Sequence, residues 1–256
     1  MLLKKPSIAI AGYGNLGRVL AATLKKRGYR VDEIVRRSSR PRLTADVVWF
    51  CVPYKAIAAT AKALAHKTDW KGKIAVHSSG ALPASELRAL QRRGASVASA
   101  HPLNTFVKKS KPELAGVPFA IEGDARATRI VTAIARELNR NAPVIRIRPE
   151  QKPLYHAMGA FASPLLVALL ANAEVVGKAA GMKDPRQSLA KIIQTTLDNY
   201  LAHGAAASFS GPLVRGDAAT VRKHLSALKN LRHQRAVYRA LAGSALELLP
   251  TPLKRI

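Results

Sequence analysis

The sequence predicts an α/β fold, with a doubly wound parallel sheet over residues 1–150 followed by an all-α domain over residues 151–256. Two observations carry this prediction. Up to about residue 150, short β-branched apolar runs alternate with amphipathic helical stretches, as in parallel sheets covered by helices on both faces. After Pro149 the strand signal stops and only helical periodicity continues.

The first domain contains seven strand-like runs and two helices with clear ends. The predicted strands cover residues 7–11, 30–35, 47–52, 74–77, 96–100, 118–122 and 144–147. The predicted helices cover residues 15–27, closed by Gly28, and 125–139.

Prolines and aspartates mark the helix starts of the second domain. Pro153 opens an apolar helix that extends to about Gly181, and Asp184 with Pro185 opens a helix that ends near residue 203. Asp217 is expected to cap a third helix rather than to take part in catalysis.

The apolar helix of the second domain resembles a membrane span in composition. Residues 157–173 carry no charge, but the run is short for a bilayer, so we expect a buried core helix and no membrane association. Pro164 removes one backbone donor, and a kink is expected there. The start of the chain lacks the pattern of a secretory signal, and the protein is expected to be cytoplasmic.

The charge of the chain raises a nucleic-acid hypothesis. There are 42 Lys and Arg against 15 Asp and Glu, a net charge of +27. Residues 1–150 hold 28 basic and 10 acidic side chains and the rest hold 14 and 5, so the charge is dispersed, and aromatic residues make up only 5%. Nucleic-acid binding is therefore not favoured. A lone cysteine, Cys51, excludes a disulfide scaffold, and no cluster with metal-ligand spacing occurs, so no metal is predicted.

The segment Gly12-Tyr13-Gly14-Asn15-Leu16-Gly17 has the GxGxxG pattern between a predicted strand and a predicted helix. In Rossmann folds the first glycine allows a tight turn, the second lets a pyrophosphate approach the backbone and the third lets helix and strand pack closely. The segment predicts a dinucleotide site, which Val52 and Pro53 at the end of the third strand would complete. A glycine turn without a ligand is the alternative.

The end of the second strand indicates which dinucleotide is bound. Asp32 and Glu33 lie too early to reach the ribose hydroxyls, whereas Arg36, Arg37 and Ser38 follow the strand. Arginine there suits a 2′-phosphate, so the cofactor is predicted to be NADP rather than NAD. A solvated basic loop is the alternative. Only about ten residues separate this loop from the next strand, too few for a crossover helix.

The chain also resembles a known family in segments that span nearly its whole length. It is similar to Rossmann-like oxidoreductases that carry a helical C-terminal domain of unknown function, within the 6-phosphogluconate dehydrogenase-like superfamily. The matching segments are GYGNLG at 12–17, VWFCVPYKAI at 48–57, HSSGAL at 77–82, ASAHPLNTF at 98–106, GVPFAIEGD at 116–124, YHAMGAFASPL at 155–165 and FSGPLVRGDAATVRKHL at 209–225.

The resemblance implies an NADP-type oxidoreductase fold and a homodimer formed through the helical domain. It implies no particular substrate. The chain departs from the family in its shortened second crossover and at Ser163-Pro164, where many relatives look like Ser-Asn.

Two histidines are candidate proton-transfer groups. His101 follows the fifth strand and Ser79 the fourth, an arrangement similar to prephenate dehydrogenases, where a serine precedes a catalytic His-Pro pair. His156 shares a helix face with Lys152 and Ser163, and in the superfamily this helix lines the active site. The alternatives are that His101 only packs before Pro102 and that the three helix residues only bond one another or the backbone.

Five residues are candidate substrate ligands. Among them, Arg215 would offer its guanidinium to a carboxylate or phosphate of the substrate. The five are Ser78, Gly80, Lys152, Ser163 and Arg215. The sequence thus predicts an NADP-dependent oxidoreductase for a small, anionic substrate held between the two domains. A non-catalytic NADP-binding redox sensor or scaffold is the alternative.

Overall fold

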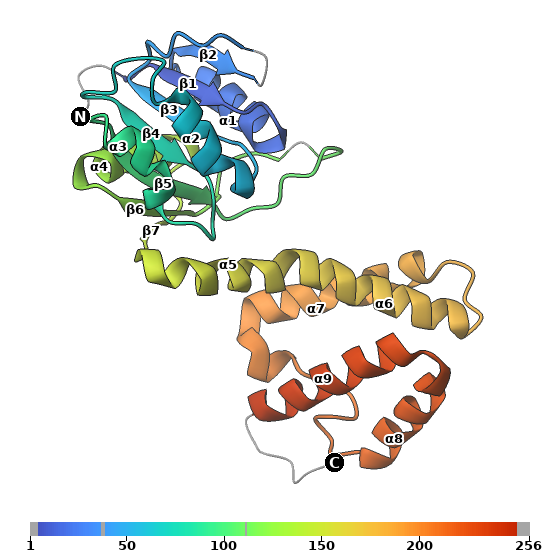
Figure 1. The fold of residues 1–256 in the computed structure, drawn as a ribbon. Helices are drawn as coiled ribbons and strands as arrows, with labels where there is room; N and C mark the ends of the chain where they lie inside the picture. Colours follow the sequence, from blue (N-terminus) through green and yellow to red (C-terminus); the bar gives the residue numbers. More distant parts are fainter. Residues whose placement is uncertain (1–4, 37–38, 111, 250–256) are drawn as a thin grey trace. The chain divides into compact units, whose positions relative to one another are not determined.

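The computed structural model describes residues 5–36, 39–110 and 112–249 (Figure 1). The chain divides into two compact units, Met1–Phe161 and Ala162–Ile256, so the division falls one helix later than the predicted boundary at residue 150. Arg37 and Ser38, two predicted cofactor ligands, lie outside the described residues.

The first unit contains a seven-stranded sheet in the order β2-β1-β3-β4-β5-β6-β7. Its strands are β1 (Ile8–Ala11), β2 (Val31–Val35), β3 (Val47–Phe50), β4 (Ile74–His77), β5 (Ser96–Pro102), β6 (Phe119–Gly123) and β7 (Val144–Arg146). The predicted α/β fold is confirmed, but the prediction that all strands run parallel is wrong at β6, which is antiparallel to β5. The described residues between β5 and β6 form no helix, and without a helical crossover the chain returns in the opposite direction.

Helices cover both faces of this sheet (Figure 1). One core lies under α1 (Asn15–Lys26) and α4 (Ala125–Leu138), the other under α2 (Ile57–Leu64) and α3 (Arg88–Gln91). Neighbouring residues of one strand serve different cores: Trp49 packs in the first and Phe50 in the second. This is the two-residue alternation of a strand buried on both faces.

The connection from β2 to β3 is as short as the sequence predicts. Its described residues form no helix, and β3 pairs with β1 on the side opposite to β2. The Glu33 carboxylate accepts hydrogen bonds from the backbone N–H groups of Arg42 at 3.0 Å and Leu43 at 2.9 Å. Leu43 is fully buried with φ +50°, a costly conformation for leucine. Glu33 therefore braces the connection that replaces the usual crossover.

A continuous helical run follows the sheet. It consists of a 3₁₀ turn (Pro149–Gln151), α5 (Lys152–Ala160), a π-helical turn (Phe161–Leu165) and α6 (Leu166–Ala179). The π turn contains Pro164, where a kink was predicted, so the helical hydrogen bonding changes there while the kink itself stays a prediction. The run is long and apolar enough to cross a membrane by length and composition, with mean hydropathy 1.7, which is weak evidence by itself. The prediction of a buried core helix is wrong, since its most apolar window is 0% buried in the described chain.

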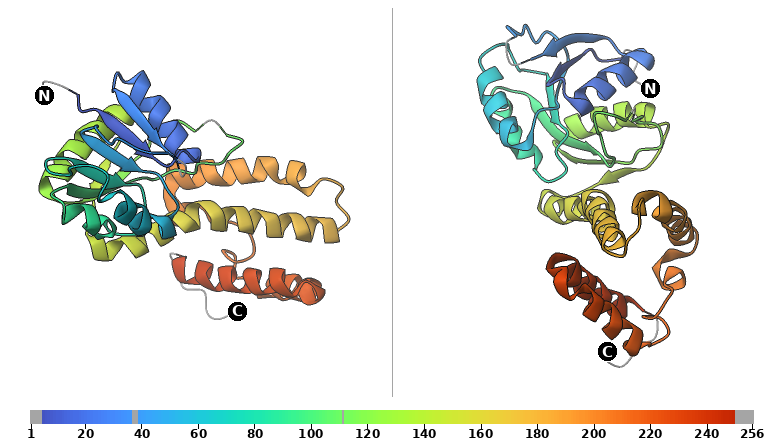
Figure 2. Two further views of the ribbon diagram at one scale, coloured as in Figure 1. Left: turned by 45° about the horizontal axis from the view of Figure 1, so that its top comes forward. Right: turned by 90° about the vertical axis from the view of Figure 1, so that its right-hand side faces the viewer.

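The second unit is entirely helical in its described part, as predicted. After α6 come α7 (Pro185–Ser208), α8 (Ala218–Ala227) and α9 (Arg232–Leu248), and α6 lies beside α7 (Figure 2). Asp184 accepts from the N–H of Gln187 and Asp217 from that of Thr220, which confirms both predicted N-caps. Gly204, with φ +75°, interrupts α7 where the sequence places its end.

Candidate functional site

The glycine loop between β1 and α1 leaves room for a ligand at one of its three glycines. Gly12 has φ +97°, and a Cβ there would lie 2.6 Å from the carbonyl oxygen of Cys51. A Cβ on Gly17 would lie 2.1 Å from the carbonyl oxygen of Gly12. A Cβ on Gly14 would meet nothing within 4 Å. The first and third glycines are thus required by packing, and the second faces open space.

The start of α1 presents backbone donors at this open position. Gly14 is the N-cap, and no side chain caps the first turn, which begins with Asn15 and the half-buried Leu16. The Asn15 amide is engaged elsewhere: it donates to the carbonyl oxygen of Phe106 at 2.9 Å and accepts from Arg18 at 2.9 Å. Free N–H groups at a helix N-terminus suit a phosphate, so the residues present fit the pyrophosphate of a dinucleotide.

Val52 and Pro53 lie beside the loop, after β3. A Cβ on Gly12 would be 2.9 Å from Cγ1 of Val52, and Pro53 is the N-cap of the 3₁₀ turn Tyr54–Ala56. Val52 therefore faces the glycine loop, and the part of Pro53 in the cofactor site stays a prediction.

Arg36 follows β2 and is held near the glycine loop. Its guanidinium carbon lies 5.2 Å from the centroid of the Tyr13 ring, a cation–π contact. Asp32 pairs with Arg30 at 2.7 Å, and Glu33 braces the β2–β3 connection. Both acidic groups of β2 thus have partners within the protein. The side chain after β2 that lies near the glycine loop is the guanidinium of Arg36.

Two histidine–tyrosine pairs lie at the carboxyl ends of β3 and β5, which flank β4 in the sheet. His101, in β5, has Nδ1 3.0 Å from the hydroxyl of Tyr155 in α5. His156, also in α5, has Nε2 3.0 Å from the hydroxyl of Tyr54, which follows β3. The two imidazole centroids are 6.1 Å apart. We call these four residues the histidine cluster; it lies wholly within the first unit.

Gly80, after β4, lies against both imidazoles. A Cβ there would be 2.8 Å from Cδ2 of His156 and 2.9 Å from Cε1 of His101. A side chain at this position would push the rings away, so glycine allows the histidine cluster to close around the turn after β4.

Burial sets the charge of the cluster. The pKa of His101 is lowered to about 4, mainly by burial, with Lys152 and the neighbouring His156 acting in the same direction. Burial also raises the pKa of Tyr155 to about 12. Near neutral pH the His101–Tyr155 pair is therefore a hydrogen bond between a neutral imidazole and a protonated phenol.

Lys152, at the start of α5, is completely buried. Its ammonium donates to the carbonyl oxygen of Ser79 at 3.0 Å and to the hydroxyl of Ser99 at 2.7 Å, and lies 4.0 Å from a carboxylate oxygen of Glu122. Burial lowers its pKa to about 8, opposed by the Glu122 charge. It was predicted to bind substrate, but the structure places its ammonium among protein acceptors.

The serines after β4 also bond to the protein. The Ser79 hydroxyl accepts from the N–H groups of Ala81 and Leu82, and the Ser78 hydroxyl accepts from the indole of Trp49 at 2.8 Å. His77 is fixed as one tautomer, because Nδ1 accepts from the N–H of Ser79, which leaves Nε2–H to donate to the carbonyl of Pro83.

Ser163 and Arg215 belong to the second unit, so their part in a site shared with the first unit stays a prediction. Ser163 lies in the π turn. Arg215 is exposed in the turn before α8. Among the described residues no group of three or more His, Cys, Asp and Glu is placed to hold a metal.

Sequence reasoning missed four residues that complete the site. Tyr54, Ser99, Glu122 and Tyr155 bond to residues that the sequence did single out. All four stand in segments that carry the family resemblance, which is the signal that could have pointed to them.

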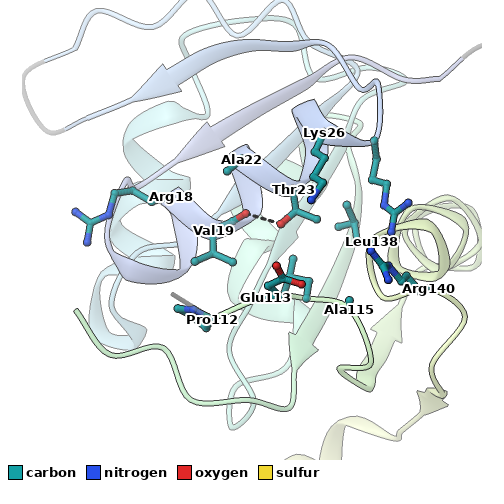
Figure 3. A pocket seen from close by; sticks show the side chains of 12 residues that line it. Arg18, Val19, Ala22, Thr23, Lys26, Pro112, Glu113, Ala115, Leu138 and Arg140 are labelled. Atoms are coloured by element: carbon teal, nitrogen blue, oxygen red, sulfur yellow. Dashed lines mark hydrogen bonds between the residues drawn. The ribbon is translucent and has the colours of Figure 1, made fainter. Parts of the chain in front are cut away.

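A separate groove runs along α1, and no residue of the histidine cluster lines it (Figure 3). Its volume is about 370 Å³, with an apolar floor that includes Val19 and Leu138 and a basic rim of Arg18, Lys26, Arg27 and Arg140. Most of these cations stand at the C-terminal ends of α1 and α4, where the helix dipole favours positive charge. The helix dipole therefore accounts for these cations without a ligand in the groove.

The fold is that of NADP-binding Rossmann oxidoreductases with a helical C-terminal region. The family profile of the "domain of unknown function (DUF2520)" matches residues 117–245, half of the chain, and the chain belongs to this family. No curated protein sequence matches it.

Three solved structures share the fold across most of both chains. A "putative NADP oxidoreductase" from Bacteroides fragilis is 19% identical with TM-score 0.79, covering 94% of this chain and 98% of that one. A protein from Thermotoga maritima is 24% identical with TM-score 0.76, covering 94% and 97%. An imine reductase from Myxococcus stipitatus, in complex with NADP+, is 14% identical with TM-score 0.67, covering 94% and 93%.

Proposed function

We propose that the protein is an NADP-dependent oxidoreductase that acts on a small, anionic substrate. The observation that carries the proposal is the histidine cluster at the carboxyl ends of β3 and β5. The glycine loop follows β1, which pairs with β3, so its open position belongs to the same edge of the sheet. Ligands of open α/β sheets bind beyond this edge.

NADP is the proposed cofactor because Arg36 stands where a 2′-phosphate is expected. The imine reductase that shares the fold was solved with NADP+, which supports the same choice. When bound, reduced NADP supplies a hydride to an electrophilic carbon of the substrate.

The chain's own residues would supply the accompanying proton to the substrate heteroatom. His101 and His156 each have a tyrosine hydroxyl on one ring nitrogen. Either imidazole would give the N–H proton of its other nitrogen to the substrate while it takes the proton of the tyrosine hydroxyl, and the tyrosine would then recover a proton from water. Ser79 would act indirectly: its hydroxyl holds the turn after β4, and that turn lies against both imidazoles. Both histidines remain candidates for the proton donor.

The charges near the cluster favour an anionic substrate over a cationic one. The described carboxylate below it, Glu122, accepts the N–H of Ala84 and faces Lys152. The chain's net charge of +27 also attracts anions over a distance, an effect that salt weakens.

The experiment is an NADPH-oxidation screen against 2-keto acids, aldehydes and imines, repeated with His101→Asn and His156→Gln. Asn places a polar atom near Nδ1 and Gln near Nε2, so each variant can keep the tyrosine contact without transferring a proton. We expect a 2-keto acid to be reduced and one variant to lose roughly 100-fold or more in rate. Full activity in both would contradict the proposed proton transfer.

The screen also separates the second hypothesis. Tight NADPH binding with no oxidation in any substrate class would favour a redox sensor or scaffold that uses the same cofactor site. A sensor would also tolerate both histidine substitutions without a change in NADPH affinity.

We further propose that the protein forms a homodimer through its helical region. Large apolar side chains there face outward: Leu154 is 78% exposed, Phe161 72%, Val167 65% and Leu201 79%. Large exposed apolar side chains often mark interaction surfaces, and a second copy of the chain would cover them.

Light scattering tests the dimer. We expect twice the 27.5 kDa chain mass, and a lower mass for Leu201→Lys but not for Asn199→Lys on the same helix. A 27.5 kDa particle at all concentrations would contradict the dimer. A protein that stays in solution only with detergent would instead point to membrane contact of the apolar helix.

A further inference from the structure

The turn after β4, residues 79–84, is held at both ends by a buried pair of opposite charges. At one end the Lys152 ammonium donates to the carbonyl oxygen of Ser79 at 3.0 Å. At the other end the Glu122 carboxylate accepts from the N–H of Ala84 at 2.6 Å. The two charged groups are 4.0 Å apart, and their side chains are 0% and 6% exposed. The turn between them contains Gly80, on which both histidines of the cluster rest.

We propose that Lys152, together with Glu122, is the positioning device of the site: it fixes the Ser79–Gly80 peptide against α5 and thereby sets the geometry of the histidine cluster. The inference rests on the proposed function only in treating His101 and His156 as the reacting groups.

The place of Lys152 in α5 supports this role. It precedes Tyr155 by three residues and His156 by four, so all three side chains leave the same face of the helix within one turn. The bond from Lys152 to the carbonyl of Ser79 therefore ties the helix turn that supplies two cluster residues to the turn that supports them.

Stability alone does not explain a buried charge pair. Removing two charges from water is costly, and apolar side chains of similar volume often hold a fold equally well. The ammonium has three partners, the Ser79 carbonyl, the Ser99 hydroxyl and Glu122, which come from β4's end, β5 and β6. An ammonium with three donors can join three elements at one point, which an apolar side chain cannot do.

The charge also acts on the imidazoles. The groups that face Lys152 are Glu122, His77 and His101, and its positive charge disfavours protonation of both histidines. Lys152 thus favours the neutral form of His101 and also holds the turn on which the histidine cluster rests.

The test uses the full chain without cofactor or substrate. Long-range 1H–15N spectra of histidine side chains report the tautomer and the pKa of each imidazole. Three variants are compared with the native protein: Lys152→Met, the double variant Lys152→Met/Glu122→Gln, and the milder Ser99→Ala, which removes one acceptor of the ammonium.

In Lys152→Met we expect the pKa of His101 to rise by roughly one unit or more, because a nearby cation is lost. The tautomer signals of His101 and His156 should change in both lysine variants, since neither retains the bond to Ser79. Ser99→Ala should shift the same signals by less. His224, whose Nδ1 lies 2.9 Å from the Tyr238 hydroxyl in the second unit, is the matched control and should not change.

Unchanged spectra of His101 and His156 in variants that only melt earlier would overturn the proposal, because a purely structural lysine predicts that result. If Lys152→Met does not fold, the double variant and Ser99→Ala decide by the same signals. The readout needs neither turnover nor NADP, so its failure leaves the proposed oxidoreductase activity standing.

Discussion

The two units of the chain treat their apolar side chains in opposite ways. In the first unit, large side chains such as Trp49 and Phe119 are completely buried on the two faces of the sheet. In the described part of the second unit, the buried apolar residues are Pro185, Val221, Leu228 and Ala245, while Leu201 is 79% exposed. The first unit has its cores within one chain, whereas the helical unit leaves large apolar side chains exposed, which supports the proposed dimer.

The largest expected effect comes from adding volume to the tightest point of the first unit. Gly17→Ala places a Cβ 2.1 Å from the carbonyl oxygen of Gly12, so β1 and α1 must separate. We expect a marked fall in melting temperature and loss of NADPH binding. Gly14→Ala meets no atom within 4 Å and should fold normally while it weakens NADPH binding. Normal folding and binding of Gly17→Ala, measured by thermal melts and calorimetry, would contradict the packing account.

A matched pair of leucines tests the comparison directly. Leu24 is 0% exposed in the first unit, and Leu24→Ala should lower the free energy of unfolding by about 2–5 kcal/mol. Leu201→Ala, in the second unit, should leave the unfolding of dilute protein nearly unchanged but weaken self-association. Chemical denaturation at several protein concentrations distinguishes the two. If Leu24→Ala and Leu201→Ala lowered the free energy of unfolding equally at every protein concentration, the contrast between the two units would be wrong.

Buried polar groups of the first unit should make its stability depend on pH. Burial, aided by Lys152, lowers the pKa of His77 to about 4 against 6.5 for a free imidazole. The unfolded chain therefore binds a proton that the folded chain excludes, so this contribution is complete above pH 6.5 and is lost as the pH falls towards 4. His77 contributes about 3 kcal/mol to this loss.

Denaturation curves between pH 4 and 7 measure this dependence. His77→Asn should flatten the loss of stability at low pH, whereas His66→Asn, at an exposed position, should not. The same slope in the native protein and in His77→Asn would show that His77 is not the titrating group.

A smaller effect is expected at Gly80. Gly80→Ala brings a methyl group within 3 Å of both imidazoles, which can shift at a cost of about 1 kcal/mol. We expect the histidine signals in 1H–15N spectra to move, with little change in melting temperature. Unmoved signals would mean that the turn does not support the cluster.

Local patterns made most of the fold predictable from sequence. Every predicted strand is present, and the caps at Asp184 and Asp217 are confirmed, because alternation and capping depend on a few neighbouring residues. The reversal of β6 could not be read in this way, because it depends on the path of the loop before it rather than on the strand's own residues.

The site was predictable only in part for the same reason. His101 and His156 could be named from their sequence context, but their tyrosine partners come from other elements at distances that only the fold sets. Lys152 was predicted as a substrate ligand because it shares a helix face with His156 and Ser163. In the fold its partners are Ser79, Ser99 and Glu122, which are far from it in the chain.

The central claim, an NADP site in the first unit, is tested most directly by calorimetric titration of the native protein with NADPH and NADH. We predict that NADPH binds roughly 10-fold or more tightly, since a guanidinium–phosphate contact contributes about 1.5–3 kcal/mol. Arg36→Ala should remove that preference, while Arg40→Ala, exposed in the same loop, should keep it. Equal affinity for NADPH and NADH in the native protein would contradict the account.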